Sequence, residues 1–138
     1  MAVFVDTSIW FAAANEGDVN CEVSRSLLVE HASSLVTSDH VLTELWNLLN
    51  ARFHHIAADR VVGEIQAGLP RIECTIDSDL EAAAEIVPKF ADQGFSLTDR
   101  TSWALMERLG IADALSLDAH YRVYRYGPEK RRAFRILP

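Results

Sequence analysis

The chain has 138 residues, of which 49% are apolar, and it carries a formal net charge of −7 at pH 7. This length is enough for one domain with a single core, and no apolar stretch approaches the roughly 18 residues of a membrane span. The negative charge argues against nonspecific binding of nucleic acid over the whole surface, but it leaves room for a local basic patch or a metal-mediated contact.

The first half of the chain alternates short apolar runs with amphipathic segments that begin at turn or capping residues. Asp18 is predicted to cap a helix whose apolar stripe includes Val19 and Val23, and Ser38 or Asp39 is predicted to cap a longer helix. The predicted elements are a strand at 2–5, helices at 7–14 and after residue 18, a strand at 35–37, and helices at 39–53 and 54–69.

The second half continues this alternation of strands and helices. Pro88 lies inside a predicted helix and is expected to kink or end it. Residues 96–99 have the S-x-x-D spacing of a capping box, and Gly110 is predicted to end the helix that they open. The predicted elements are a strand at 71–76, helices at 80–92 and 96–109, a strand at 114–117, a helical turn, and an edge strand at 133–137.

This order of elements predicts one α/β domain over residues 1–138, with a central, mainly parallel sheet of about five strands between two layers of helices. The N-terminus lacks the basic region of a signal peptide. Cys21 and Cys74 have no metal-binding spacing, so we expect two reduced thiols in a cytoplasmic protein.

Four acidic residues are expected to meet at one edge of this sheet. Asp6 and Asp118 each follow a predicted strand, and Thr7 or Ser8 is expected to cap the helix after Asp6. Asp99 lies in the first turn of a helix, and the second turn of another helix contains Glu44. In a parallel sheet, the strands end at the edge where the connecting helices begin. The four carboxylates are therefore predicted to converge there.

Four carboxylates in one small cleft repel one another, and a divalent cation removes that repulsion. Oxygen ligands favour Mg²⁺ or Mn²⁺ over zinc, and such ions assist hydrolysis of phosphodiesters. Each acid also has a plainer interpretation. Asp6 or Asp118 alone would serve as a turn or capping residue, Asp99 as a partner of the helix dipole, and Glu44 as a residue at the rim of the core.

Four short motifs in this order resemble those of PIN-domain ribonucleases, and most closely the VapC toxins of bacterial toxin–antitoxin pairs. They are Val-Asp-Thr-Ser at 5–8, Thr-Glu-Leu at 43–45, Ser-Leu-Thr-Asp at 96–99 with its continuation to 111, and Leu-Asp-Ala-His-Tyr at 117–121. Together the motifs cover almost the whole chain. The pattern departs from the family after Tyr121, where five residues precede Gly127, although family members often have a glycine sooner.

The resemblance implies an endoribonuclease that depends on Mg²⁺ or Mn²⁺. It implies that Asp6, Glu44, Asp99 and Asp118 hold one or two ions and orient the attacking water, with Ser8 as a supporting hydroxyl near the metal. It also implies a cognate small antitoxin like those called VapB, and a homodimer. The helices at 41–53 and 56–69 are candidates for the groove that receives the antitoxin.

A basic segment with interspersed tyrosines follows the last acidic motif. Its cations would neutralise RNA phosphates, and Tyr124 and Tyr126 would offer stacking faces. The plainer interpretation is a solvated loop that balances the acidic surface. The candidate RNA-binding residues are His120, Arg122, Arg125, Lys130, Arg131 and Arg132.

Two other classes of protein fit the sequence less well. Phosphatases that form an aspartyl phosphate need a second aspartate at the position of Ser8, and receiver domains need an early acidic pair and a late lysine at a strand end. The only lysines are Lys89 and Lys130. A non-catalytic PIN-like module that only binds partners also stays open, although the presence of all four acids argues against it.

Overall fold

Five short strands form one sheet in the computed structural model, which describes all 138 residues. The order across the sheet is β3-β2-β1-β4-β5, and every neighbouring pair is parallel. The predicted parallel sheet is thus confirmed, with the last strand at an edge. The strands are β1 (Val3–Val5), β2 (Leu35–Ser38), β3 (Arg71–Glu73), β4 (Asp113–Leu115) and β5 (Arg135–Leu137).

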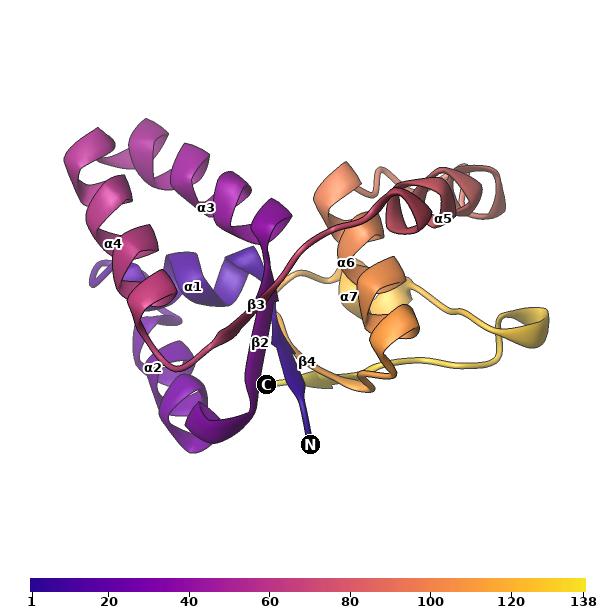
Figure 1. Cartoon of the computed structure of the whole chain (residues 1–138), viewed down its shortest axis with the longest axis horizontal. Helices are drawn as coiled ribbons and strands as arrows, with labels where there is room; N and C mark the ends of the chain where they lie inside the picture. The colour runs from indigo at the N-terminus through magenta and orange to yellow at the C-terminus, as the bar shows by residue number, and fades with distance from the viewer.

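Helices cover both faces of the sheet and give the three layers that the sequence predicts (Figure 1). On one side lie α1 (Thr7–Ala14), α2 (Cys21–Glu30), α3 (Asp39–Arg52) and α4 (His55–Ala67). On the other side lie α5 (Asp77–Lys89), α6 (Leu97–Leu109) and α7 (His120–Val123). Short 3-10 turns at Ala32–Ser34 and Pro128–Lys130 complete the chain. None of the helices has the length and apolar character needed to cross a bilayer.

The strand order reverses direction at β1, because the chain moves from β1 outward to β2 and β3 and then returns to the opposite side of β1 for β4 and β5. Ligands of open α/β sheets bind beyond the carboxyl ends of the strands at such a switch point. Asp6 directly follows β1, and its backbone N–H donates to the carbonyl of Leu115, the last residue of β4, at 3.0 Å. The fold therefore places Asp6 at this position.

Helix α6 is held at its two ends by the residues that the sequence predicts. The Ser96 hydroxyl accepts from the Asp99 N–H at 3.0 Å, and the Asp99 carboxylate accepts from the Ser96 N–H at 3.4 Å. Gly110 ends the helix with φ of +69°, in the left-handed region that glycine adopts without a steric penalty. The predicted capping box is confirmed, and it fixes the first turn that carries Asp99.

The entry to α2 differs from the prediction. The helix begins at Cys21, and the Asp18 side chain instead accepts from the Asn20 N–H at 2.7 Å within the preceding turn. This turn lies outside the helix and leaves Val19 93% exposed, while Val23 is also exposed. The apolar stripe predicted from these two valines is wrong, because the helix starts too late to carry the first of them.

Three further boundaries also differ. Asp6 itself occupies the N-cap position of α1, and Thr7 is already helical. Strand β3 ends at Glu73 because helix α5 begins at Asp77, where the Asp79 carboxylate accepts from the Ile76 N–H at 3.0 Å. Helix α5 then ends at Lys89, directly after Pro88, as the early-end alternative predicts.

Candidate active site

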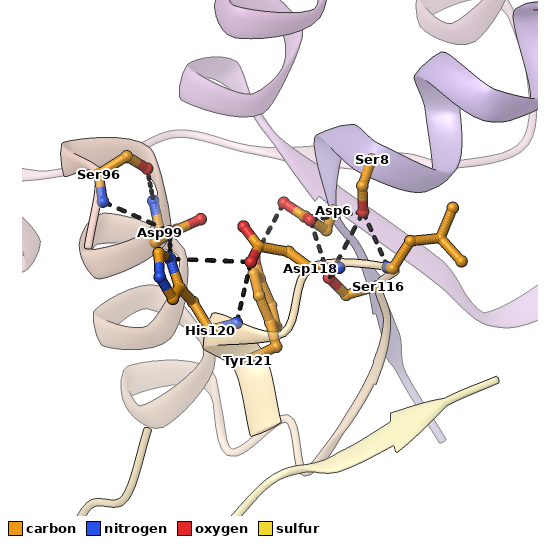
Figure 2. Close-up of polar contacts among 9 residues, drawn as sticks. Asp6, Ser8, Ser96, Asp99, Ser116, Asp118, His120 and Tyr121 are labelled. Carbon is orange, nitrogen blue, oxygen red and sulfur yellow. Dashed lines mark hydrogen bonds and ion pairs between the residues drawn. The ribbon is translucent and has the colours of Figure 1, made fainter. Parts of the chain in front are cut away.

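Asp6 is a buried carboxylate held by three hydroxyl groups (Figure 2). Ser8 and Ser116 both donate to its Oδ2 atom, at 2.8 and 2.9 Å, and the Tyr121 hydroxyl donates to Oδ1 at 3.2 Å. Ser8 also accepts from the Leu117 N–H at 2.9 Å, so it joins α1 to the loop after β4. These contacts fix both oxygens of the Asp6 side chain relative to the loop that carries Asp118.

Asp118 lies in that loop and not directly at a strand end, because β4 stops at Leu115. The loop is ordered by its own polar groups. The Ser116 hydroxyl accepts from the Asp118 N–H at 3.1 Å, and the Asp118 carboxylate accepts from the His120 N–H at 2.9 Å. The predicted strand at 114–117 thus starts one residue too late and ends two residues too late, but Asp118 still reaches the predicted edge of the sheet.

Asp99 and Asp118 approach each other from α6 and the loop, with the imidazole of His120 between them (Figure 2). The Nδ1 atom of His120 lies 3.5 Å from Asp99 Oδ2 and 3.7 Å from Asp118 Oδ1. One ligand atom from each of the three residues falls within 4.8 Å of the other two. The His120 ring packs edge-on against Phe95, with ring centroids 5.1 Å apart. This packing orients the imidazole toward the carboxylates.

Asp6 and Asp99 hold protons more tightly than isolated carboxyl groups do. Burial raises the pKa of Asp6, in spite of the hydroxyl donors that oppose this effect. Burial, followed by the negative charges of Asp6, Asp118 and Glu44, raises the pKa of Asp99 to about 7. Excess negative charge in a partly buried cluster of oxygen ligands is the environment that a divalent cation neutralises. The donor set of this site therefore fits a metal of the Mg²⁺ or Mn²⁺ class.

Glu44 lies at the rim of the cluster. Its half-buried side chain extends from the second turn of α3, and its charge acts on Asp99 more weakly than the charges of Asp6 and Asp118 do. It lines an open groove together with Thr98, the residue before Asp99. The structure thus brings Asp6, Asp99 and Asp118 into one site, with Glu44 at its edge facing α6.

Asp113 is a second aspartate near Asp118, and it has a different role. It lies at the start of β4, and Arg135 pairs with its carboxylate through two contacts at 3.2 and 2.8 Å. It therefore lies at the opposite edge of the sheet and serves as a structural ion pair.

Two hydroxyl groups of the site were not assigned by sequence reasoning. Ser116 and Tyr121 both donate to Asp6, yet they stand 110 and 115 positions from it in the chain. Ser116 could have been found from its position two residues before Asp118. In an extended segment, this spacing places both side chains on the same side. Tyr121 ends the motif at 117–121, but nothing in the sequence indicates that its hydroxyl reaches Asp6, because an aromatic residue in a helical turn is expected in the core.

Tyr121→Phe tests whether its hydroxyl positions Asp6. We expect the variant to lose about 1 kcal/mol of unfolding free energy and to cleave RNA about 10-fold more slowly, since the aromatic ring stays packed and one hydrogen bond is lost. Chemical denaturation and initial cleavage rates measure the two effects. Val123→Ala, at an exposed position of the same short helix, is the control. Equal cleavage rates in the two variants would contradict a positioning role.

The basic segment after Tyr121 is exposed, but many of its cations already have partners. Arg125 donates to the carbonyls of Arg122 and Tyr124, Lys130 donates to the carbonyl of Lys89, and Arg131 pairs with Glu129. Arg122 donates to the carbonyl of Pro138. Arg132 is exposed.

The tyrosines of this segment do not offer stacking faces, and that prediction is wrong. Tyr124 is buried and stacks on Trp103, with ring centroids 4.3 Å apart and an interplanar angle of 7°. Tyr126 is half-buried and stacks on Phe134 at 4.5 Å. Both rings pack in the aromatic cluster beneath α6. Burial of their apolar surface there is more favourable than exposure of the rings to a ligand.

Comparison with known proteins decides the family. The profile of the family described as PIN domain matches residues 3–125. The chain belongs to the PIN domain family. Among curated proteins, it is 35% identical over 120 residues to the 23S rRNA-specific endonuclease VapC20 of Mycobacterium tuberculosis, covering 86% of this chain and 91% of the relative. It is 26% identical over 119 residues to Ribonuclease VapC26 of the same species, covering 86% and 88%.

A solved structure agrees with this PIN domain assignment. The crystal structure of M. tuberculosis VapC20, described as a Sarcin-Ricin loop cleaving toxin, matches with a TM-score of 0.82 and 32% sequence identity. The match covers 88% of this chain and 94% of the other. The family and the fold class that the sequence predicts are confirmed by these findings, and the printed names of the relatives, which describe an endonuclease, a ribonuclease and a toxin, agree with the predicted function.

Proposed function

We propose that this PIN domain hydrolyses RNA with the help of Mg²⁺ or Mn²⁺, at the site formed by Asp6, Asp99 and Asp118. The observation that supports this proposal most strongly is the meeting of these carboxylates at the switch point of the sheet, where burial and mutual repulsion raise the pKa values of Asp6 and Asp99. A cluster that only stabilised the fold would pair its acids with cations, as Asp79 pairs with Arg108 at 2.9 Å.

Asp6, Asp99 and Asp118 would hold one or two ions, with Glu44 as a further ligand at the rim. A bound divalent cation would supply an activated water and stabilise charge on the leaving oxygen. The protein's own contribution is orientation. The hydroxyls of Ser8, Ser116 and Tyr121 hold both oxygens of Asp6, and the capping box of α6 holds Asp99.

His120 is the partly exposed side chain that lies against two of the acids. Its Nδ1 atom lies between the carboxylates of Asp99 and Asp118, and its side chain is 36% exposed. The imidazole is therefore open to solvent and to a bound RNA while it lies against the acids. We assign it a contact with the RNA phosphate or the leaving group, in addition to its place beside the acids.

Structured ribosomal RNA is the substrate class that we propose, by analogy with the relative whose name specifies 23S rRNA. The exposed cations Arg122, Arg125, Lys130, Arg131 and Arg132 would contact phosphates beyond the cleavage site. We place this activity in the cytoplasm, where such RNA is found.

An antitoxin of the VapB kind is the protein partner that we propose, because the relatives at 35% and 26% identity both carry the VapC name. A groove of about 390 Å³ lies between α3 and α4, the two helices that the sequence indicates for this role. Its apolar lining residues are Leu42, Trp46, Val62 and Ile72. We also propose that the chain forms a homodimer, which sedimentation analysis of the purified chain would test.

RNA cleavage by the purified chain tests the proposed function. Intact 23S rRNA and total RNA are incubated with the chain in Mg²⁺, in Mn²⁺ and in EDTA, and the new RNA ends are mapped. We expect cleavage at few positions in either metal and none in EDTA. Cleavage that persists in EDTA would contradict the metal site.

Intact RNA under every condition would favour the alternative of a PIN-like module that only binds partners. Thermal unfolding with and without Mn²⁺ provides a second measurement. A site that binds metal raises the melting temperature, whereas a module without one gains no stability from the ion.

A further inference from the structure

One stripe of α3 lines an open groove that faces the N-terminal turn of α6. The groove has a volume of about 540 Å³, within the range of small-ligand sites. Five of its residues follow helical spacing along α3, and the sixth comes from α6. The lining residues are His40, Thr43, Glu44, Asn47, Leu48 and Thr98. We call this surface the α3 groove.

The α3 groove adjoins the site of the proposed reaction at two of its residues. Glu44 is one of the four acids, and its charge acts on Asp99. Thr98 directly precedes Asp99 in the first turn of α6. The groove is therefore the neighbouring surface for a nucleotide whose phosphate lies at the acid cluster.

His40 lines the groove and has one ring nitrogen that makes no hydrogen bond within the chain. The single hydroxyl proton of Thr101 is directed to main-chain carbonyls, 3.0 Å from that of Leu97 and 3.2 Å from that of Thr98. Thr101 must then accept the hydrogen bond that joins it to His40 Nδ1 at 3.1 Å, so Nδ1 carries the proton. In the uncharged form of the ring, Nε2 is then an acceptor, and no hydrogen bond within the chain involves that atom.

Asn47 and Leu48 complete a surface suited to a base. Asn47 is exposed, and its amide makes no hydrogen bond within the chain, which leaves two donors and one acceptor for a base edge. Leu48 is 43% exposed and offers an apolar contact beside the amide, although its helical spacing predicts a core residue. Proteins read unpaired RNA bases through this combination of apolar contact and hydrogen bonds to the base edge.

We propose that the α3 groove receives one unpaired nucleotide beside the bond that is cut, and that His40 and Asn47 read its base. This inference rests on the proposed ribonuclease function and adds the determinant of its sequence preference. The polar lining favours an RNA base over an apolar protein segment, since five of the six lining residues are polar or charged.

Cleavage of an RNA pool with randomised unpaired positions tests the proposal. The pool is cut by the unaltered chain, by Asn47→Ala and by Asn50→Ala, and the product ends are sequenced. Asn50 is exposed on the same helix but does not line the groove, so it is the matched control. We expect the unaltered chain to prefer one base beside the cut. Asn47→Ala should reduce that preference about 5- to 100-fold, and Asn50→Ala should retain it.

The stabilisation by Mn²⁺ is measured for the same proteins and should be equal in all three, because neither asparagine belongs to the acid cluster. Equal base preference in Asn47→Ala and Asn50→Ala, with cleavage intact, would overturn the groove proposal and leave the α3 groove as a surface for another macromolecule. Failure of the unaltered chain to cut any RNA in the pool would instead overturn the proposed function, and the groove proposal with it.

Discussion

Asp99→Asn is expected to lower RNA cleavage by about 10²- to 10³-fold or more while the fold is retained. The substitution removes one negative charge and one ligand oxygen from the cluster. It keeps the shape of the side chain, and its amide oxygen can still accept from the Ser96 N–H in the capping box. The loss of activity would therefore report on the metal site and not on the first turn of α6.

The variant is compared with Asp92→Asn, an exposed aspartate in the loop after α5. Cleavage rates at saturating Mn²⁺, and the rise in melting temperature caused by Mn²⁺, are measured for both. We expect Asp99→Asn to lose both properties and Asp92→Asn to keep both. Activity of Asp99→Asn within a few-fold of the unaltered chain would remove Asp99 from the site.

Asp6→Asn is expected to be equally inactive but less stable. Both oxygens of Asp6 accept hydrogen bonds from hydroxyl groups, so an amide nitrogen at either position would face a donor. The free energy of unfolding should fall by about 1–3 kcal/mol, the usual effect of an unsatisfied buried polar group. For this reason Asp99→Asn is the sharper test of the catalytic site.

The sheet and its covering layers follow from local patterns in the sequence. Short apolar runs gave four of the five strands to within about two residues, and the capping residues Ser38 and Ser96 were identified before their helices. These patterns were sufficient because each depends on neighbouring residues only. The boundaries that failed, such as that of α2, depend on a turn in which Asp18 bonds to Asn20 instead of to the helix.

The candidate site could be predicted only in part for the same reason. The chain order of strands and helices places Asp6, Asp99 and Asp118 at one edge, and this much follows from topology alone. The hydroxyls of Ser116 and Tyr121 reach Asp6 through the conformation of the loop after β4, which no periodic pattern encodes. The burial of Tyr124 against Trp103 likewise depends on tertiary packing, so a ring expected to stack on RNA became part of the core.

The metal-free protein is expected to lose stability as the pH rises from about 4 to about 7. The Asp99 carboxyl has a pKa of about 7 in the folded chain, against 3.8 as the ordinary value, so the folded state keeps a proton that the unfolded state has released. A group with a raised pKa stabilises the fold fully below its unfolded pKa and loses that contribution as the pH passes through the folded value. This difference between the two pKa values corresponds to about 4 kcal/mol of unfolding free energy. The Asp99 side chain is only 6% exposed.

The choice of pH range separates the loss of stability caused by Asp99 from the contributions of other carboxyl groups. Hydrogen bonds lower the pKa values of Asp39, which bonds to Thr75, and of Asp79, which bonds to Arg108. Their stabilising contributions are complete above about pH 4 and are lost only at more acidic pH. Between pH 5 and 8 they stay constant, while the raised pKa of Asp99, about 7, lies within this range.

Urea unfolding of the unaltered chain and of Asp99→Asn in EDTA, at intervals from pH 5 to 8, measures the effect. Asp99→Asn cannot ionise, so its advantage in unfolding free energy should grow with pH and reach a plateau above pH 7. Addition of Mn²⁺ should stabilise the unaltered chain far more at pH 8 than at pH 5, because the ion and the proton compete for the same carboxylates. Parallel pH profiles for the two proteins in EDTA would show that Asp99 is already ionised at pH 5, and that the cluster accommodates its negative charges without a cation.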